Sequence, residues 1–257
     1  MSFEVVVLGA SGTVPAPGSA CSGYLLRSQG AEVWADAGSG TFANLLATSE
    51  LVGLQALVLT HMHLDHVADV YPFYHWVRFG RGNPGLMGVP VHAPPGSGPH
   101  LAQILTPYGT GTFGEYLRFN DIGDGHRVTI GPFTLTFART LHPVETYAVR
   151  AEAEGRVVVY TADTGPSDHV TALAEGADVL VAEASMQEAR DDMREVHMTA
   201  TEAGEMAGAA GAGRLVLTHI PPGLDPGVSV EQARVAFGGD VVVAADRLVL
   251  PVEARSR

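Results

Sequence analysis

The chain has 257 residues, enough for one large domain or two small ones, and 46% of them are hydrophobic, a share that excludes intrinsic disorder. Its 28 acidic residues outnumber its 15 basic ones, and the resulting net charge of −13 argues against a general nucleic-acid-binding surface. The single cysteine, Cys21, excludes an intrachain disulfide and a cysteine-based zinc finger.

The first half of the chain predicts short buried strands separated by loops and helices. Runs rich in Val and Leu that end at Gly, Pro or polar residues are typical of such strands. We expect strands at residues 3–8, 24–27, 32–35, 54–59 and 89–92, and helices at residues 41–48, 66–79 and 99–105. Residues 11–23 and much of residues 80–98 are rich in Gly and Pro, which predicts loops.

The second half predicts two hairpins followed by strands that alternate with helices. The hairpins are expected at residues 127–138 and 147–160, the second with Glu154 and Gly155 at its turn. Further strands are expected at residues 179–182, 215–217, 241–243 and 248–252, and helices at residues 167–174, 199–210 and 229–237. Thr199 and Glu202 have the spacing of a capping box, which supports the start of the second of these helices.

This alternation indicates an α/β fold in which helices cover sheets, within a single domain that spans residues 1–257. The order of the strands does not follow from the sequence. No apolar run reaches the length of a membrane span, and no basic leader precedes the first predicted strand. We therefore expect a cytoplasmic protein with no membrane partner.

Four side chains that can bind a metal lie within six residues, directly after the predicted strand at residues 54–59. They are His61, His63, Asp65 and His66. Three imidazoles this close together would pack poorly in a core and would serve no purpose on a surface. Neutral imidazole and carboxylate groups, however, suit zinc and similar divalent ions. The cluster therefore predicts a metal site at the end of a buried strand.

Three further candidate ligands each follow an apolar run. They are His142, Asp163 and His219. Alone, each would more often be a hydrogen-bonded residue at the end of a strand. Together with the cluster they supply the remaining ligands of a two-metal site, in which a pair of ions activates a shared water for hydrolysis.

In this order the motifs resemble those of the metallo-β-lactamase superfamily, and the match covers nearly the whole chain. The resemblance implies a four-layer αββα sandwich with two divalent metal ions, Zn²⁺ or alternatively Mn²⁺, at one edge of the sheets. It also implies two ligand sets that share a bridge: His61, His63 and His142 for the first metal, Asp65, His66 and His219 for the second, and Asp163 between them. By the same resemblance, Asp65 orients or deprotonates the attacking water.

Two motifs further along the chain resemble the ribonuclease Z-like branch of this superfamily. Glu183 follows a predicted strand, and His197 stands just before the predicted helix at residues 199–210. The resemblance implies that His197 donates a proton to the leaving oxygen and that Glu183 orients His197. The alternatives are a salt bridge at the rim of the site and an exposed histidine at a helix start.

The short interval between His142 and Asp163 sets this chain apart from ribonuclease Z, in which a long arm that grips tRNA projects from this interval. A hairpin fills it here, without a basic, Gly-rich insert. Residues 22–26, 201–204 and 218–222 resemble motifs of short bacterial cyclic-nucleotide phosphodiesterases. We therefore expect a dinuclear phosphodiesterase that hydrolyses a small phosphodiester, with a cyclic nucleotide such as cAMP as the favoured substrate, through attack by a metal-bound hydroxide.

Other functions stay open on the sequence alone. The same scaffold carries lactonases, phosphotriesterases, arylsulfatases and tRNA 3′-processing endonucleases, and a scaffold does not fix a substrate. The complete ligand set counts against a non-catalytic metal-binding protein, and the resemblance suggests a homodimer. Cys21 receives no role. The aromatic residues at 71–79 are expected to pack in the core, with stacking on a base as the alternative.

Overall fold

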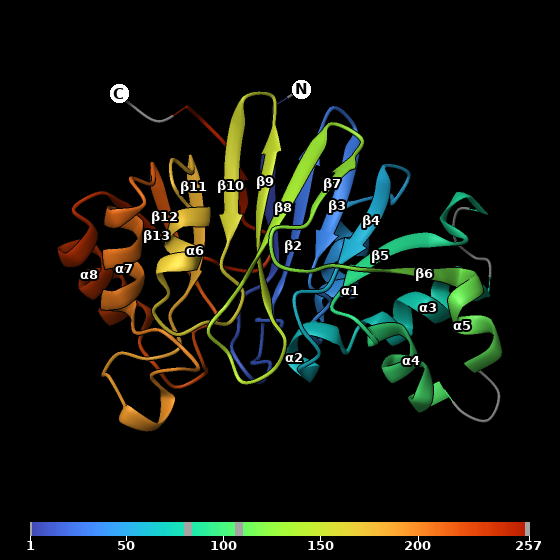
Figure 1. Cartoon of the computed structure of the whole chain (residues 1–257), viewed down its shortest axis with the longest axis horizontal. Helices are drawn as coiled ribbons and strands as arrows, with labels where there is room; N and C mark the ends of the chain where they lie inside the picture. The colour runs from blue at the N-terminus through green and yellow to red at the C-terminus, as the bar shows by residue number, and fades with distance from the viewer. Residues whose placement is uncertain (1, 80–83, 106–109, 255–257) are drawn as a thin grey trace.

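Two seven-stranded sheets pack face to face in the computed structural model, which describes residues 2–79, 84–105 and 110–254 (Figure 1). The first sheet has the strand order β14 (Val249–Pro251), β1 (Glu4–Gly9), β2 (Gly23–Ser28), β3 (Ala31–Ala35), β4 (Leu54–Val58), β5 (Val89–Ala93) and β6 (Leu117–Asp121). The second has the order β13 (Asp240–Val243), β12 (Arg214–Thr218), β11 (Val179–Glu183), β10 (Arg156–Tyr160), β9 (Tyr147–Ala153), β8 (Phe133–Arg139) and β7 (Arg127–Ile130). Each sheet joins an antiparallel half to a parallel half.

Helices cover the outer face of each sheet (Figure 1). The first sheet is covered by α1 (Thr41–Thr48), α2 (Leu64–Val67), α3 (Val70–Arg78), α4 (Ser97–Ala102) and α5 (Thr110–Tyr116). The second sheet is covered by α6 (Asp168–Leu173), α7 (Ala200–Ala209) and α8 (Pro226–Phe237). The four-layer αββα sandwich expected from the sequence is therefore confirmed.

The central strands bury both of their faces. In β1, Val5 and Val7 pack between the two sheets, whereas Val6 and Leu8 pack under the outer helices. Successive side chains of a strand point to opposite faces, so a strand covered on both sides needs apolar residues at every position. This is why the strands stand out in the sequence as unbroken runs of Val and Leu.

The local signals for the hairpins and for one helix start are confirmed. Strands β7 and β8 pair antiparallel, as do β9 and β10. Glu154 and Gly155 both have left-handed backbone, with φ of 53° and 70°, as a two-residue turn of this kind requires. Thr199 caps α7, and its side chain and that of Glu202 form the reciprocal bonds of a capping box.

The prediction of one helix over residues 66–79 is wrong. The chain forms two helices there, α2 and α3, and breaks between them at Ala68 and Asp69. The Asp69 carboxylate accepts a hydrogen bond of 2.8 Å from the backbone N–H of Phe42 in the first turn of α1. This contact joins segments far apart in the sequence, so no local pattern announces the break. Within α3, Phe73 and Tyr74 are fully buried, as expected of the aromatic residues in this segment.

Three further predictions need correction. The sequence does not predict α5 or β6, because glycine and threonine obscure α5 and because β6 depends on its pairing with β5. The helix expected at residues 229–237 begins earlier, at Pro226, because Asp225 caps it and proline suits the first turn. The helix expected at residues 99–105 is α4 followed by a 3₁₀ turn, Gln103–Leu105.

Within the described ranges, no helix is long and apolar enough to cross a bilayer.

The carboxyl ends of four strands of the second sheet meet at one edge. Strands β10, β11 and β12 run parallel, and β8 runs in the same direction because β8 and β10 both pair antiparallel with β9. Strand β4 of the first sheet ends at this edge too, since the Tyr147 N–H donates to the Thr60 carbonyl at 3.1 Å. The loops that follow these strands therefore converge, which is the usual place for a site in α/β proteins.

Candidate metal centre

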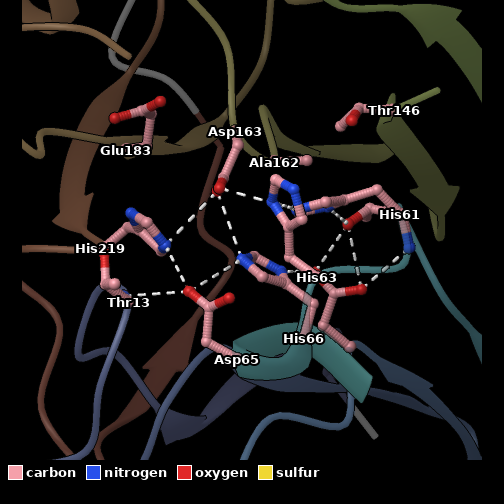
Figure 2. A network of polar contacts seen from close by, with 12 residues as sticks. Thr13, His61, His63, Asp65, His66, Thr146, Ala162, Asp163, Glu183 and His219 are labelled. Carbon is pink, nitrogen blue, oxygen red and sulfur yellow. Dashed lines mark hydrogen bonds and ion pairs between the residues drawn. The ribbon is translucent and has the colours of Figure 1, made fainter. Parts of the chain in front are cut away.

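The loops at this edge bring together all seven residues that the sequence predicts as metal ligands. The loop after β4 and helix α2 supply His61, His63, Asp65 and His66, and the loops after β8, β10 and β12 supply His142, Asp163 and His219. Figure 2 shows the Asp163 carboxylate at the middle of this group, between His61, His66 and His219. Both sheets thus contribute to one cluster.

The first predicted ligand set converges on one point. His63 Nδ1 lies 3.1 Å from His61 Nε2 and 3.3 Å from His142 Nε2. Asp163 Oδ2 lies 3.6 Å from His61 Nε2. These four ligand atoms lie within 4.8 Å of one another, which is the spacing of donors around a single ion.

The second set converges on a neighbouring point. Asp65 Oδ2 lies 3.1 Å from His219 Nε2 and 3.7 Å from His66 Nε2. Asp163 Oδ1 lies 3.3 Å from His66 Nε2 and 3.5 Å from His219 Nε2. The two oxygens of Asp163 therefore face different sets, Oδ2 the first and Oδ1 the second, as a bridging carboxylate requires.

Two buried polar atoms of the cluster lack a hydrogen bond. They are His66 Nε2 and Asp163 Oδ1, which face each other. Burying a polar atom without a partner is costly, and such atoms are rare in native structures. A divalent cation among nitrogen and oxygen donors would satisfy both atoms, so the residues present fit a metal ion.

Burial sets the charge of the imidazoles in the first set. It lowers the pKa of His61 well below its ordinary value and also lowers the pKa values of His63 and His142. Neutral imidazole is the form that binds a metal. Burial raises the pKa of the Asp163 carboxyl, but the neighbouring His219 and His66 outweigh burial and hold that pKa well below its usual range.

A third carboxylate, Asp36, supports the cluster from outside the two ligand sets. It follows β3 and is fully buried. Asp36 Oδ2 lies 2.7 Å from His66 Nδ1 and accepts hydrogen bonds from the Tyr160 and Thr60 hydroxyls at 2.9 and 2.8 Å. Burial lowers the pKa of His66, but Asp163 and Asp36 outweigh it and raise that pKa well above its ordinary value. Carboxylates behind ligand histidines fix ring orientation and tautomer.

Four residues around the cluster have left-handed backbone although they are not glycine. Thr13, Asp36, Ala162 and His219 have φ of 62°, 58°, 53° and 55°. This conformation is unfavourable for residues with a Cβ, and it persists only where the surrounding structure enforces it. Strain of this kind gathers where side chains are held in a functional arrangement.

The predicted proton donor, His197, lies beside the second set. His197 Nδ1 is 2.8 Å from Glu183 Oε1, and its ring centroid is 5.4 Å from that of His219. Burial lowers the pKa of His197, but the hydrogen bond to Glu183 and the charge of Glu183 outweigh it and raise that pKa. The pair therefore lies, largely buried, beside the ligand cluster.

A surface cavity of about 490 Å³ opens next to the first set. It is lined by His142 and by the segment that leads to His197, including Arg194 and Val196. The Val196 carbonyl lies 2.9 Å from His142 Nδ1 and holds this ligand ring. A small molecule in the cavity would therefore contact one predicted ligand, His142.

Sequence reasoning missed Asp36, Thr60, Ser185 and Thr13. Thr60 and Ser185 are neighbours of residues that it did single out, and Thr13 donates its backbone N–H to Asp65 Oδ2 at 2.9 Å. Only Asp36 carried a signal that sequence reasoning could have used, since it is an acidic residue directly after an apolar strand, as Asp163 is. Cys21 is buried, and burial raises the pKa of its thiol to about 11.

A family model, a curated protein and a solved structure that match this chain all point to one superfamily. The family model of the β-lactamase superfamily domain matches residues 32–220. The probable metallo-hydrolase YhfI of Bacillus subtilis is 34% identical over 96% of this chain and 99% of its own length. The crystal structure of YhfI superposes with a TM-score of 0.86 at 32% identity, covering 97% of this chain and 99% of that chain.

Two further matches are a ribonuclease and the structure of a diphosphatase. Ribonuclease Z of Mycobacterium bovis is 30% identical over 95% of this chain and 96% of its own length. The crystal structure of a diphosphatase from the PhnP family has a TM-score of 0.74 at 17% identity and covers 99% of this chain and 100% of that chain. At this identity the second likeness concerns the fold alone.

Proposed function

The chain belongs to the β-lactamase superfamily as a metallo-hydrolase, and from this premise we propose that it is a phosphodiesterase acting on a small cyclic nucleotide such as cAMP. The proposal treats residues 1–257 as one hydrolase domain. The observation that carries it is the contact of 2.8 Å between His197 and Glu183 beside the second ligand set. Hydrolysis of a cyclic nucleotide expels a basic ribose alkoxide, and a positioned proton donor speeds its departure.

We assign the two ligand sets to two divalent ions, with Zn²⁺ as the first choice and Mn²⁺ as the alternative. The first set is His61, His63 and His142, the second is Asp65, His66 and His219, and Asp163 bridges them. When bound, two such ions lower the pKa of a shared water and neutralise charge on the phosphoryl oxygens. Imidazole and carboxylate donors in this number suit Zn²⁺.

We assign the orientation of the attacking water and the donation of a proton to side chains of the protein. Asp65 uses Oδ2 for its contacts with the Thr13 N–H and with His219, and we assign Oδ1 to orienting the attacking water. His197 donates from Nδ1 to Glu183, and we assign its Nε2–H to the leaving oxygen. Glu183 stabilises the positive charge of the donor until the proton is transferred.

Three features favour a small substrate. The interval between His142 and Asp163 holds the β9–β10 hairpin, with the tight turn at Glu154 and Gly155 in place of an arm. The net charge of −13 opposes the neutralisation of several phosphates that binding of tRNA needs. The cavity beside His142 has room for a mononucleotide-sized ligand.

The test is a matched assay of the metal-loaded protein with three substrates: cAMP, a bis-aryl phosphodiester and a lactone. We expect hydrolysis of both phosphodiesters and little opening of the lactone. Efficient lactone opening without cleavage of either phosphodiester would replace this proposal with a lactonase. A second candidate, a tRNA 3′-processing endonuclease, is favoured by the 30% identity to ribonuclease Z.

A further inference from the structure

We infer that Ser185 is a positioning residue that fixes the tautomer of the ligand His219 and connects it to the Glu183–His197 pair. Ser185 Oγ donates to Glu183 Oε2 at 2.7 Å and lies 2.8 Å from His219 Nδ1. It also lies 3.4 Å from His197 Nδ1. One hydroxyl therefore stands between the second ligand set and the proton donor.

The number of protons on a hydroxyl decides the direction of these bonds. A serine hydroxyl has one proton and can accept from other donors. The Glu183 carboxylate at 2.7 Å and the His219 backbone carbonyl at 3.2 Å can only accept, so the one proton of Ser185 goes to an oxygen acceptor, of which Glu183 Oε2 is the nearer. His219 Nδ1 must then donate to Ser185, which leaves His219 Nε2 without a proton. Nε2 is the atom that faces Asp65 Oδ2 at 3.1 Å and Asp163 Oδ1 at 3.5 Å.

The first ligand set has the same arrangement. Thr60 Oγ1 donates to Asp36 Oδ2 at 2.8 Å and lies 3.1 Å from His61 Nδ1. An imidazole, a hydroxyl and a buried carboxylate thus follow one another on each side of the Asp163 bridge. The repetition on two unrelated loops supports a shared purpose, which is to present an unprotonated Nε2 to each ion.

The two imidazole–hydroxyl–carboxylate series differ in the other residues that each carboxylate contacts. Asp36 contacts a second ligand, His66, whereas Glu183 contacts His197. Glu183 also accepts from the backbone N–H of Thr164, next to the bridging Asp163, at 2.9 Å. Movement of Ser185 would therefore change the second ligand set and the proton donor together, while the first set would keep its own support.

The inference rests on the ligand roles in the proposed function, but its experiment needs no substrate. Metal-free protein is titrated with Zn²⁺ by calorimetry for the wild type, Ser185→Ala, Ser185→Thr and Ser97→Ala. Ser97 is a buried serine whose hydroxyl donates to the Pro94 carbonyl, remote from the ligands, and it serves as the matched control. We expect Ser185→Ala to weaken one of two Zn²⁺ sites by about 10–100-fold and to leave the other unchanged. Ser185→Thr, which keeps the hydroxyl, and Ser97→Ala should bind as the wild type does.

A second measurement uses the wild type alone and does not depend on the folding of any variant. Imidazole ¹H–¹⁵N NMR spectra of the metal-free protein, at a pH where His219 is neutral, should show its proton on Nδ1. A proton on Nε2 would overturn the inference, as would unchanged affinity of both Zn²⁺ sites in folded Ser185→Ala or equal weakening of both. If the wild type showed no phosphodiesterase activity but the Zn²⁺ titrations gave the expected result, only the proposed function would be contradicted.

Discussion

The Glu183 carboxylate serves several donors at once. Oε1 contacts His197 Nδ1 and the Thr164 N–H, and Oε2 accepts from the Ser185 N–H and hydroxyl. The imidazole ring of His197, in contrast, has hydrogen-bond contacts with Glu183 and Ser185 alone among the described residues. Replacing one of these two residues is therefore expected to have different consequences from replacing the other.

His197→Ala should lose activity selectively. General acid catalysis contributes about 10²–10⁴ in rate, so we expect a loss of that size on cAMP, whose leaving group is a basic alkoxide. On a bis-aryl phosphodiester the loss should be much smaller, because a nitrophenolate leaves without a proton. The measurement is kcat on both substrates, with metal content as the control. Equal losses with unchanged metal content would assign His197 to phosphate binding instead.

Glu183→Gln should affect stability as well as activity. A glutamine amide offers one acceptor oxygen where the carboxylate serves four donors, so at least one buried donor loses its partner. We expect the free energy of unfolding to fall by about 1–3 kcal/mol. Denaturant unfolding of metal-free protein measures it, with Glu175→Gln, a substitution in the turn that follows α6, as the control. Unchanged stability would show that the amide satisfies all the donors.

The sequence indicated the ligands far better than their supports. The cluster at residues 61–66 is contiguous, so one strand and its loop reveal it. Asp36 and Ser185 act on His66 and His219, thirty and thirty-four positions away, and only the packed fold brings them together. A metal ligand can be recognised by its residue type, whereas a supporting residue can be recognised only by its position in the folded structure.

At the level of secondary structure, one carboxylate connects two helical segments. Asp69 stands in the break between α2 and α3 and accepts from the Phe42 N–H at the start of α1. The free N–H groups of a first helical turn need such acceptors. Asp69 therefore fixes the position of α2, which carries Asp65 and His66, relative to α1.

Asp69→Ala should destabilise the protein by about 0.5–2 kcal/mol, the usual cost of losing a helix-capping acceptor. Asp69→Asn keeps an acceptor oxygen and should lose less. Thermal and urea unfolding of both variants check this expectation. A larger loss in the asparagine variant than in the alanine variant would show that packing around Asp69, and not its acceptor, holds the helices.

Elements with a local signature were predictable, and those defined by distant contacts were not. The turn at Glu154 and Gly155 and the capping box at Thr199 depend on adjacent residues, and both are confirmed. The break at Asp69 depends on α1, and β6 on pairing with β5, which no neighbouring residue announces. Strand order likewise depends on contacts across the whole chain.

For the whole molecule, removal of metal should lower both activity and stability. We expect about two ions per chain after purification and loss of activity with a chelator. An ion at about one hundred times its dissociation constant stabilises the folded state by about 2.7 kcal/mol. Metal analysis together with thermal unfolding, with and without chelator, tests this. Active, folded protein without metal would contradict the two-metal centre.

Substrate size is also a property of the whole molecule. The acidic surface and the short β9–β10 hairpin should make the protein cleave cAMP and process precursor tRNA poorly. Both substrates are assayed at matched enzyme concentration and at two salt concentrations. Efficient cleavage of precursor tRNA at one position would favour the endonuclease over the cyclic-nucleotide phosphodiesterase.

Each proposed ion would draw ligands from both sheets, and this has a kinetic consequence. In the first set, His61 and His63 follow a strand of the first sheet and His142 follows a strand of the second. In the second set, His66 lies in α2, after the first sheet's β4, and His219 follows the second sheet's β12. An ion held across this edge must leave one sheet before the two can separate. Contacts that are absent from the transition state of folding slow unfolding without speeding folding. Bound metal would therefore act as a removable cross-link that slows unfolding and prolongs the lifetime of the folded molecule.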